Sequence, residues 1–97
     1  MKTQFTPGPW HIKPEHPYRI HGHNKDAPYS VVIAETCGYK LMRERNAALI
    51  AAAPDMFEAL QELLKQIGAW FPGSIPAQLA GAAEQARTAL QKANGGE

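Results

Sequence analysis

The chain has one cysteine, no long apolar run and almost no net charge. Because Cys37 stands alone, no disulfide can form within the chain, which favours a reducing cytoplasm. The longest apolar candidate, AALIAAAP at 47–54, is too short for a membrane span, and the N-terminus has no apolar signal core. The formal net charge of +1 argues against strong nucleic-acid binding. We therefore expect a cytoplasmic protein with neither a membrane nor a nucleic acid as its partner.

The few charges are unevenly divided along the chain. Residues 1–45 hold seven Lys or Arg against four Asp or Glu, a balance of +3, together with all four histidines. Residues 46–97 hold three against five, a balance of −2. An anionic partner would prefer the first half, although this imbalance also fits an ordinary scatter of surface charge.

The order of local patterns predicts strands first and helices second, in a single α+β domain over 1–97. Two prolines and Gly8 make residues 1–9 an extended arm. Residues 10–38 form a small antiparallel β-meander of about three strands, with short strands at 10–13, 18–21 and 29–36. The prolines at 14 and 17 bracket a loop, and 22–28 has turn chemistry. Two to three helices over 40–93 and a frayed tail at 94–97 complete the chain.

Pro54 divides the helical part into two segments. A proline disfavours helix at the residue before it, and it is well tolerated in the first turn of a new helix, where Asp55 also adds a favourable carboxylate. Apolar residues then recur at helical spacing in two stripes. One such stripe would stay exposed in a monomer of this size, so we expect a homodimer or larger assembly. The stripes contain Phe57, Leu60, Leu63, Leu64 and Ile67, and then Ile75, Leu79, Ala82, Ala83, Ala86 and Leu90.

Two motifs carry a family resemblance over most of residues 5–64. Thr6–Trp10 reads TPGPW, and residues 46–60 read NAALIAAAPDMFEAL. Together with a short β-meander, these motifs resemble a widespread family of small phage and prophage proteins with a TPGPW start and an N-A-x-L-I-A-A-A-P-x-x-x-E-A-L helix pair. The resemblance implies a viral origin. Small phage proteins of this size often counter host immunity, either by binding a defence protein or by holding a nucleotide immune signal without cleaving it.

Basic residues of the first half suggest a site for a phosphate-bearing ligand. Arg19 and His21 share the polar face of a strand, and Arg43 and its neighbours lie at the start of the first long helix. Arginine suits phosphate oxygens, and Asn46 offers both donors and acceptors. Trp10 could stack on a base, although the favoured interpretation is that it packs into the core between sheet and helix or into a neighbouring subunit. A solvated helix edge is the ordinary alternative for the helical residues. The predicted ligand-binding set is Trp10, His11, Arg19, His21, Lys40, Arg43, Arg45 and Asn46.

The sequence gives little support for metal binding or for catalysis. His21 and His23 form an H-x-H pair to which His11 or His16 could add a third metal ligand, but solvated loop histidines explain the pattern better. No serine or cysteine has a nucleophile's context, and a pairing of His21 with Asp26 would be commonplace. We therefore expect no metal, no cofactor and no catalysis.

These observations lead to one functional expectation and one alternative. The leading expectation is a phage counter-defence protein that sequesters a small anionic nucleotide, such as a cyclic oligonucleotide or an ADP-ribose derivative, at a subunit interface. The alternative is an interaction protein that inhibits a host defence protein by binding it directly.

Overall fold

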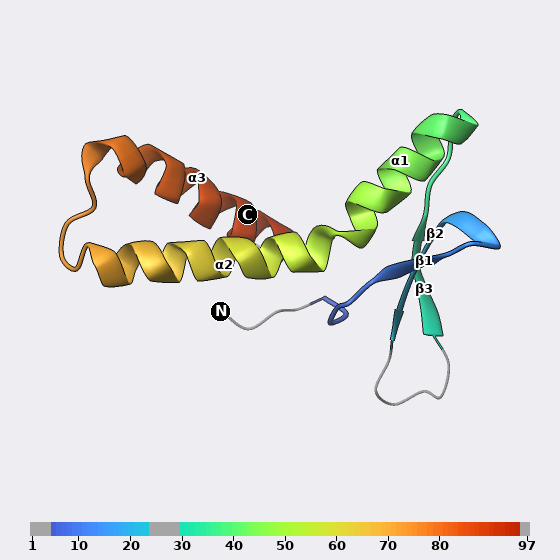
Figure 1. The fold of residues 1–97 in the computed structure, drawn as a ribbon, viewed down its shortest axis with the longest axis horizontal. Coiled ribbons are helices and arrows are strands. Elements are labelled where there is room, and N and C mark those ends of the chain that lie inside the picture. The colour runs from blue at the N-terminus through green and yellow to red at the C-terminus, as the bar shows by residue number, and fades with distance from the viewer. Residues whose placement is uncertain (1–4, 24–29, 96–97) are drawn as a thin grey trace. The chain divides into compact units, whose positions relative to one another are not determined.

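The computed structural model describes residues 5–23 and 30–95. Its elements are β1 (His11–Lys13), β2 (His16–His23), β3 (Ser30–Glu35), α1 (Lys40–Ala51), α2 (Ala53–Trp70) and α3 (Ala77–Ala93), as Figure 1 shows. The α+β class, with three antiparallel strands followed by three helices, is thus confirmed. The chain forms two compact units, Met1–Asp55 and Met56–Glu97, and each is described by itself below.

The sheet of the first unit has the order β1-β2-β3, so β2 is its central strand. The sequence prediction was wrong about the extent of β2, which includes both Pro17 and Gly22. Pro17 lies near the beginning of the strand, where the loss of a ladder hydrogen bond costs least. Gly22 lies in a tight place, because a Cβ there would lie 3.0 Å from Ile33 Cδ1 and 3.3 Å from Thr6 Cγ2, closer than ordinary contacts. The predicted turn residues after His23, and Tyr29 of the third predicted strand, lie outside the described residues.

Helix α1 packs against β2 and forms the core of the first unit. Ile20 of β2 and Ala47 of α1 have no exposed surface, and the small side chain of Ala47 lets the helix approach the sheet closely. The Thr36 hydroxyl fixes the start of the helix, because it donates a hydrogen bond to the Arg43 carbonyl at 2.7 Å. The Arg43 guanidinium lies 4.5 Å from the centre of the Tyr18 ring.

The two proline motifs of the sequence meet in this unit. Helix α1 ends at Ala51 and α2 begins at Ala53, with Pro54 in its first turn, as predicted. Pro54 is buried, and a Cβ placed on Gly8 would lie only 2.7 Å from Pro54 Cβ. The arm therefore runs directly against the junction of the two helices, and glycine at position 8 permits this close approach.

The second unit contains most of α2 and the whole of α3. Helix α3 folds back and runs in the opposite direction to α2 (Figure 1). Phe57, Ala83 and Leu90 are its buried apolar side chains among the residues described. The predicted stripes are only partly buried, since Leu63 remains 59% exposed. This unit thus buries a small core and leaves large apolar side chains in contact with solvent.

Candidate functional site

The residues predicted to bind a ligand lie on two faces of the sheet. Tyr18 and Ile20 face α1, as their contacts and burial show. Because successive residues of a strand point to opposite faces, Arg19 and His21 lie on the face away from α1. The structure therefore does not bring Arg19 and His21 together with the cationic residues of α1 within one chain.

The predicted residues of α1 differ strongly in their surroundings. Arg43 is half-buried above Tyr18, and its Nε has no hydrogen-bond partner. Lys40, Arg45 and Asn46 are exposed, and neither of these two cations is in an ion pair within the described ranges. This exposed edge can receive an anion, but it forms no enclosed pocket of its own.

Histidines and cations of β1 and β2 gather around His21. The pairing of β1 with β2 shifts register between His16 and His21, so the ring of His16 approaches His21 although simple alternation would place it on the other face. We call this surface, formed by His11, Lys13, His16, Arg19 and His21, the histidine face. His21 is only 6% exposed as a residue. The His11 ring stacks on it at a centroid distance of 5.7 Å, and the His16 ring lies at 6.4 Å. The sequence predicted a solvated His21, but the rings of His11 and His16 pack near it and the residue is buried.

His21 has an unusual electrostatic environment. Neither of its two ring nitrogens has a hydrogen-bond partner, and both are buried. Burial lowers the pKa of His21 below its usual value, and the nearby positive charges of Lys13, His11, His16 and Arg19 lower it further. The ring is therefore held in its neutral form near pH 7.

Two polar contacts cross the sheet around His21. Lys13 Nζ of β1 donates a hydrogen bond to Ser30 Oγ of β3 at 3.2 Å. Because β2 lies between these strands, the Lys13 side chain must span it. Arg19 Nε donates to Glu35 Oε1 at 2.5 Å, and this hydrogen bond and charge lower the pKa of the Glu35 carboxyl. The Glu35 carboxylate thus offsets part of the positive charge of this face.

Metal chemistry gains no support from the geometry. In the described ranges, no group of three or more His, Cys, Asp or Glu side chains is arranged to hold a metal ion. The proximity of Lys13 and Arg19 would also repel a cation. Asp26, considered as a partner of His21, lies outside the described residues.

Trp10 turns back onto its own arm. Its indole N–H donates to the Thr6 carbonyl at 3.0 Å, and its ring meets the edge of Phe5 at a centroid distance of 6.1 Å. The side chain is half-buried. These contacts give Trp10 a packing role within the arm.

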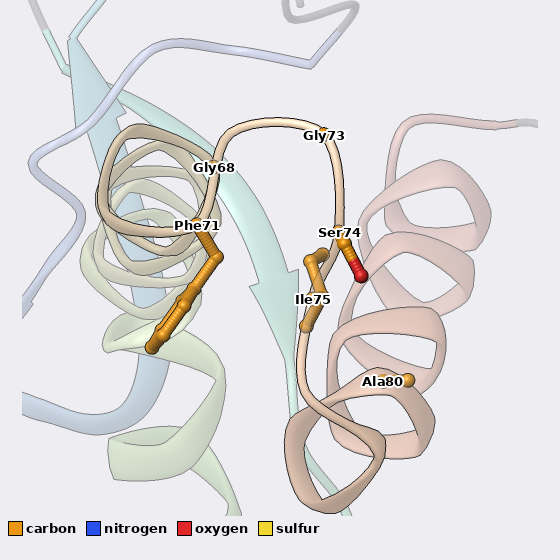
Figure 2. Close-up of a pocket in the computed structure, with 6 residues that line it drawn as sticks. All are labelled: Gly68, Phe71, Gly73, Ser74, Ile75 and Ala80. Carbon is orange, nitrogen blue, oxygen red and sulfur yellow. The ribbon is translucent and has the colours of Figure 1, made fainter.

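The second unit carries a hollow that sequence reasoning did not identify. A depression of about 480 Å³ lies where α2 turns into α3, and the side chains of Phe71 and Ile75 line it (Figure 2). No charged residue lines the hollow, whose other contacts are Gly68, Gly73, Ser74 and Ala80. Trp70, next to Phe71, is 76% exposed. We call Trp70, Phe71 and Ile75 with this hollow the hairpin end. The only sequence signal for it was the pair of aromatic residues in a break rich in Pro and Gly.

Comparisons with known proteins place the chain in a viral family. No helix in the described part of the chain has the length and apolar character needed to cross a membrane. Neither a search of curated proteins nor a search of solved structures found a match. The model of one family, described as Salmonella phage P22 protein Y8K6, matches residues 1–97. This match supports the resemblance to small phage proteins, and the chain therefore belongs to the Salmonella phage P22 protein Y8K6 family.

Proposed function

We propose that this phage protein acts by binding another protein, without catalysis, and that its partner is a component of the host's defence in the cytoplasm of the infected bacterium. The observation that carries this proposal is the hairpin end, where Trp70 is 76% exposed next to Phe71, which lines a hollow without charged residues. Membership of a phage family supplies the host as the setting.

Burial of Trp70 in an interface would contribute a large free energy of binding for a single side chain. An aromatic side chain covers about 150–250 Å². Burying the exposed three-quarters of Trp70 would therefore contribute about 3–5 kcal/mol at roughly 25 cal/mol per Å². Tryptophan is also among the residues most enriched at the energetic centres of protein interfaces. The hollow, with a volume of about 480 Å³, has room for an apolar side chain of the partner.

A genetic experiment tests this proposal. The protein is expressed in a panel of hosts, each carrying one defence system, and phage plating is measured. We expect the wild-type protein to restore plating on at least one host, and Trp70→Ser to lose at least about tenfold of this effect, since it removes the interface anchor. Leu49→Ser is the matched control, because Leu49 of α1 is also an exposed apolar residue, at 61%. Full activity of Trp70→Ser, or no rescue on any host, would contradict the proposal.

A second candidate is sequestration of a small anionic nucleotide, such as a cyclic oligonucleotide or an ADP-ribose derivative, between copies of the chain. The exposed cations Lys40 and Arg45 of α1 favour it. Exposed leucines lie on the same helix, since Leu41 is 56% and Leu49 is 61% exposed. A second copy could cover these leucines and complete a pocket around the cations and Asn46.

Sedimentation and calorimetry separate the two candidates. Sequestration predicts a homodimer or larger species that binds one nucleotide of a panel, and Arg45→Met is expected to weaken that binding by at least about tenfold. A monomer that binds none of the nucleotides would refute sequestration and leave protein binding at the hairpin end untouched. Product analysis after incubation would reveal any turnover, which both candidates exclude.

A further inference from the structure

The buried ring of His21 lacks the hydrogen bonds that a buried polar group normally makes. Its two nitrogens are inaccessible and unpartnered, although nearly all buried polar side-chain atoms in proteins make a hydrogen bond. A neutral imidazole needs one acceptor for its N–H and one donor for its bare nitrogen, whereas a protonated ring needs two acceptors. In either form the ring therefore lacks at least one hydrogen-bond acceptor.

The charges around His21 show which acceptor would fit. Groups that carry or can gain a positive charge lie near it on two of the three strands, namely His11 and Lys13 on β1 and His16 and Arg19 on β2. Its partner across the ladder on β3 is the uncharged Val32. The carboxylate of Glu35, across from Arg19 in the ladder, is engaged by Arg19. A cation would be repelled here, whereas an anion would meet the positive charges and the free ring nitrogens together.

We propose that the histidine face binds a phosphate group, either free or as a phosphate ester, held by His11, Lys13 and His16 over the ring of His21. Phosphate oxygens accept several hydrogen bonds at once and match donors of this kind. The site stands apart from protein binding at the hairpin end, because all of its residues belong to the first unit.

Lys13 controls access to the ring. Its hydrogen bond to Ser30 Oγ, at 3.2 Å, holds the side chain across β2. When this hydrogen bond is exchanged for one to a phosphate oxygen, the lysine stem moves and the ammonium group joins the site. His11 is exposed and His16 is half-buried, so both rings can turn toward the ligand. The bound anion then favours the protonated form of His21, since it supplies acceptors and an opposite charge.

The proposal predicts a specific pH dependence of anion binding. Sulfate is the cleaner probe, because its charge does not change in this range. We expect sulfate to bind more tightly as the pH falls from about 8 to about 6, where histidines gain protons. Imidazole resonances of His21 should move on titration, and its pKa should rise when sulfate is bound. Untagged protein is required, since a histidine tag adds imidazoles.

Variants of the full chain make the test decisive. Lys13→Met keeps the stem but removes the charge, and we expect it to weaken sulfate and phosphate binding at least about tenfold. Lys92→Met, an exposed lysine of α3 in the second unit, is the matched control and should leave affinity unchanged. Because His21→Leu could unfold the unit, the unmodified His21 resonances serve as the direct readout. Adenosine monophosphate added in a second arm distinguishes the two sources, since an affinity at least about tenfold above that of phosphate identifies a nucleotide ester.

Three results would overturn the proposal. The first is equal sulfate affinity of Lys13→Met and the wild type. The second is an absence of any change in the His21 resonances at saturating phosphate. The third is binding of Zn²⁺ by His21 in place of an anion, which would show that the free nitrogens serve as metal ligands.

Discussion

Replacement of Gly8 by alanine tests whether the arm and the helix junction form one contact. The added Cβ would lie 2.7 Å from Cβ and 3.3 Å from Cγ of Pro54. Carbon atoms in ordinary contact are separated by about 3.5–4.0 Å. The overlap is therefore close to 1 Å, and Pro54 cannot rotate away because its ring is fixed to the backbone at a buried position.

The size of the effect follows from this overlap. Forcing an extra carbon into a packed contact costs about 1–3 kcal/mol, so Gly8→Ala should lower the free energy of unfolding of the first unit by this amount. Gly81→Ala is the matched control, since nothing lies within 4 Å of a Cβ at that exposed position of α3. It should stabilise α3 by up to about 1 kcal/mol, because alanine favours helix over glycine.

Tryptophan fluorescence during urea unfolding gives the readout. In a Trp70→Phe background, Trp10 reports on the first unit alone. Gly8→Ala should shift the Trp10 transition to lower urea, and Gly81→Ala should not lower it. A Gly8→Ala variant as stable as the wild type would show that the arm does not press on Pro54, and would refute this part of the structure.

Three further predictions concern the first unit. Its free energy of unfolding should be constant above about pH 6.5 and should fall by at most about 1.4 kcal/mol per pH unit below it. The reason is that His21 has a lowered pKa in the folded chain, so below this pH the unfolded chain binds a proton that the folded chain does not. Thr36→Val should cost about 0.5–1.5 kcal/mol in urea titrations, since the hydrogen bond to the Arg43 carbonyl is lost. Arg19→Ala should destabilise less than Thr36→Val, because its pair is exposed, but it should raise the pKa of Glu35 toward the usual value in an NMR titration.

Each of these predictions has a clear contrary result. Stability that stays constant through this pH range would mean that His21 is not shielded from protons. If Thr36→Val had no effect, the hydroxyl would not hold the start of α1. An unchanged pKa of Glu35 in Arg19→Ala would show that the arginine does not set it.

Local patterns predicted the elements well. The β-branched run VVI, the helix formers after Lys40 and the proline at position 54 each act on their own neighbours, so the order of strands and helices and the start of α2 could be read from the sequence. Pro54 was the most informative single residue, because its effect on the backbone depends little on tertiary context.

Contacts between distant segments could not be predicted in the same way. Gly22 looked like a turn residue, and only the approach of Ile33 and Thr6 explains its place inside β2. His21 looked exposed, and its burial goes with the rings of His11 and His16, which are brought to it by the pairing of β1 with β2. Trp70 is the last residue of α2, and its local sequence did not show that 76% of it would be exposed.

Site-specific cross-linking in infected cells tests the central claim, that the hairpin end binds another protein, most directly. A photoreactive amino acid is placed at position 70, and in a control chain at position 87, an exposed residue of α3. From position 70 we predict one cross-linked product, which joins the protein to a second, different protein. From position 87 we predict that this product is absent. The same products from both positions, or cross-links from position 70 only to further copies of the chain, would contradict the claim.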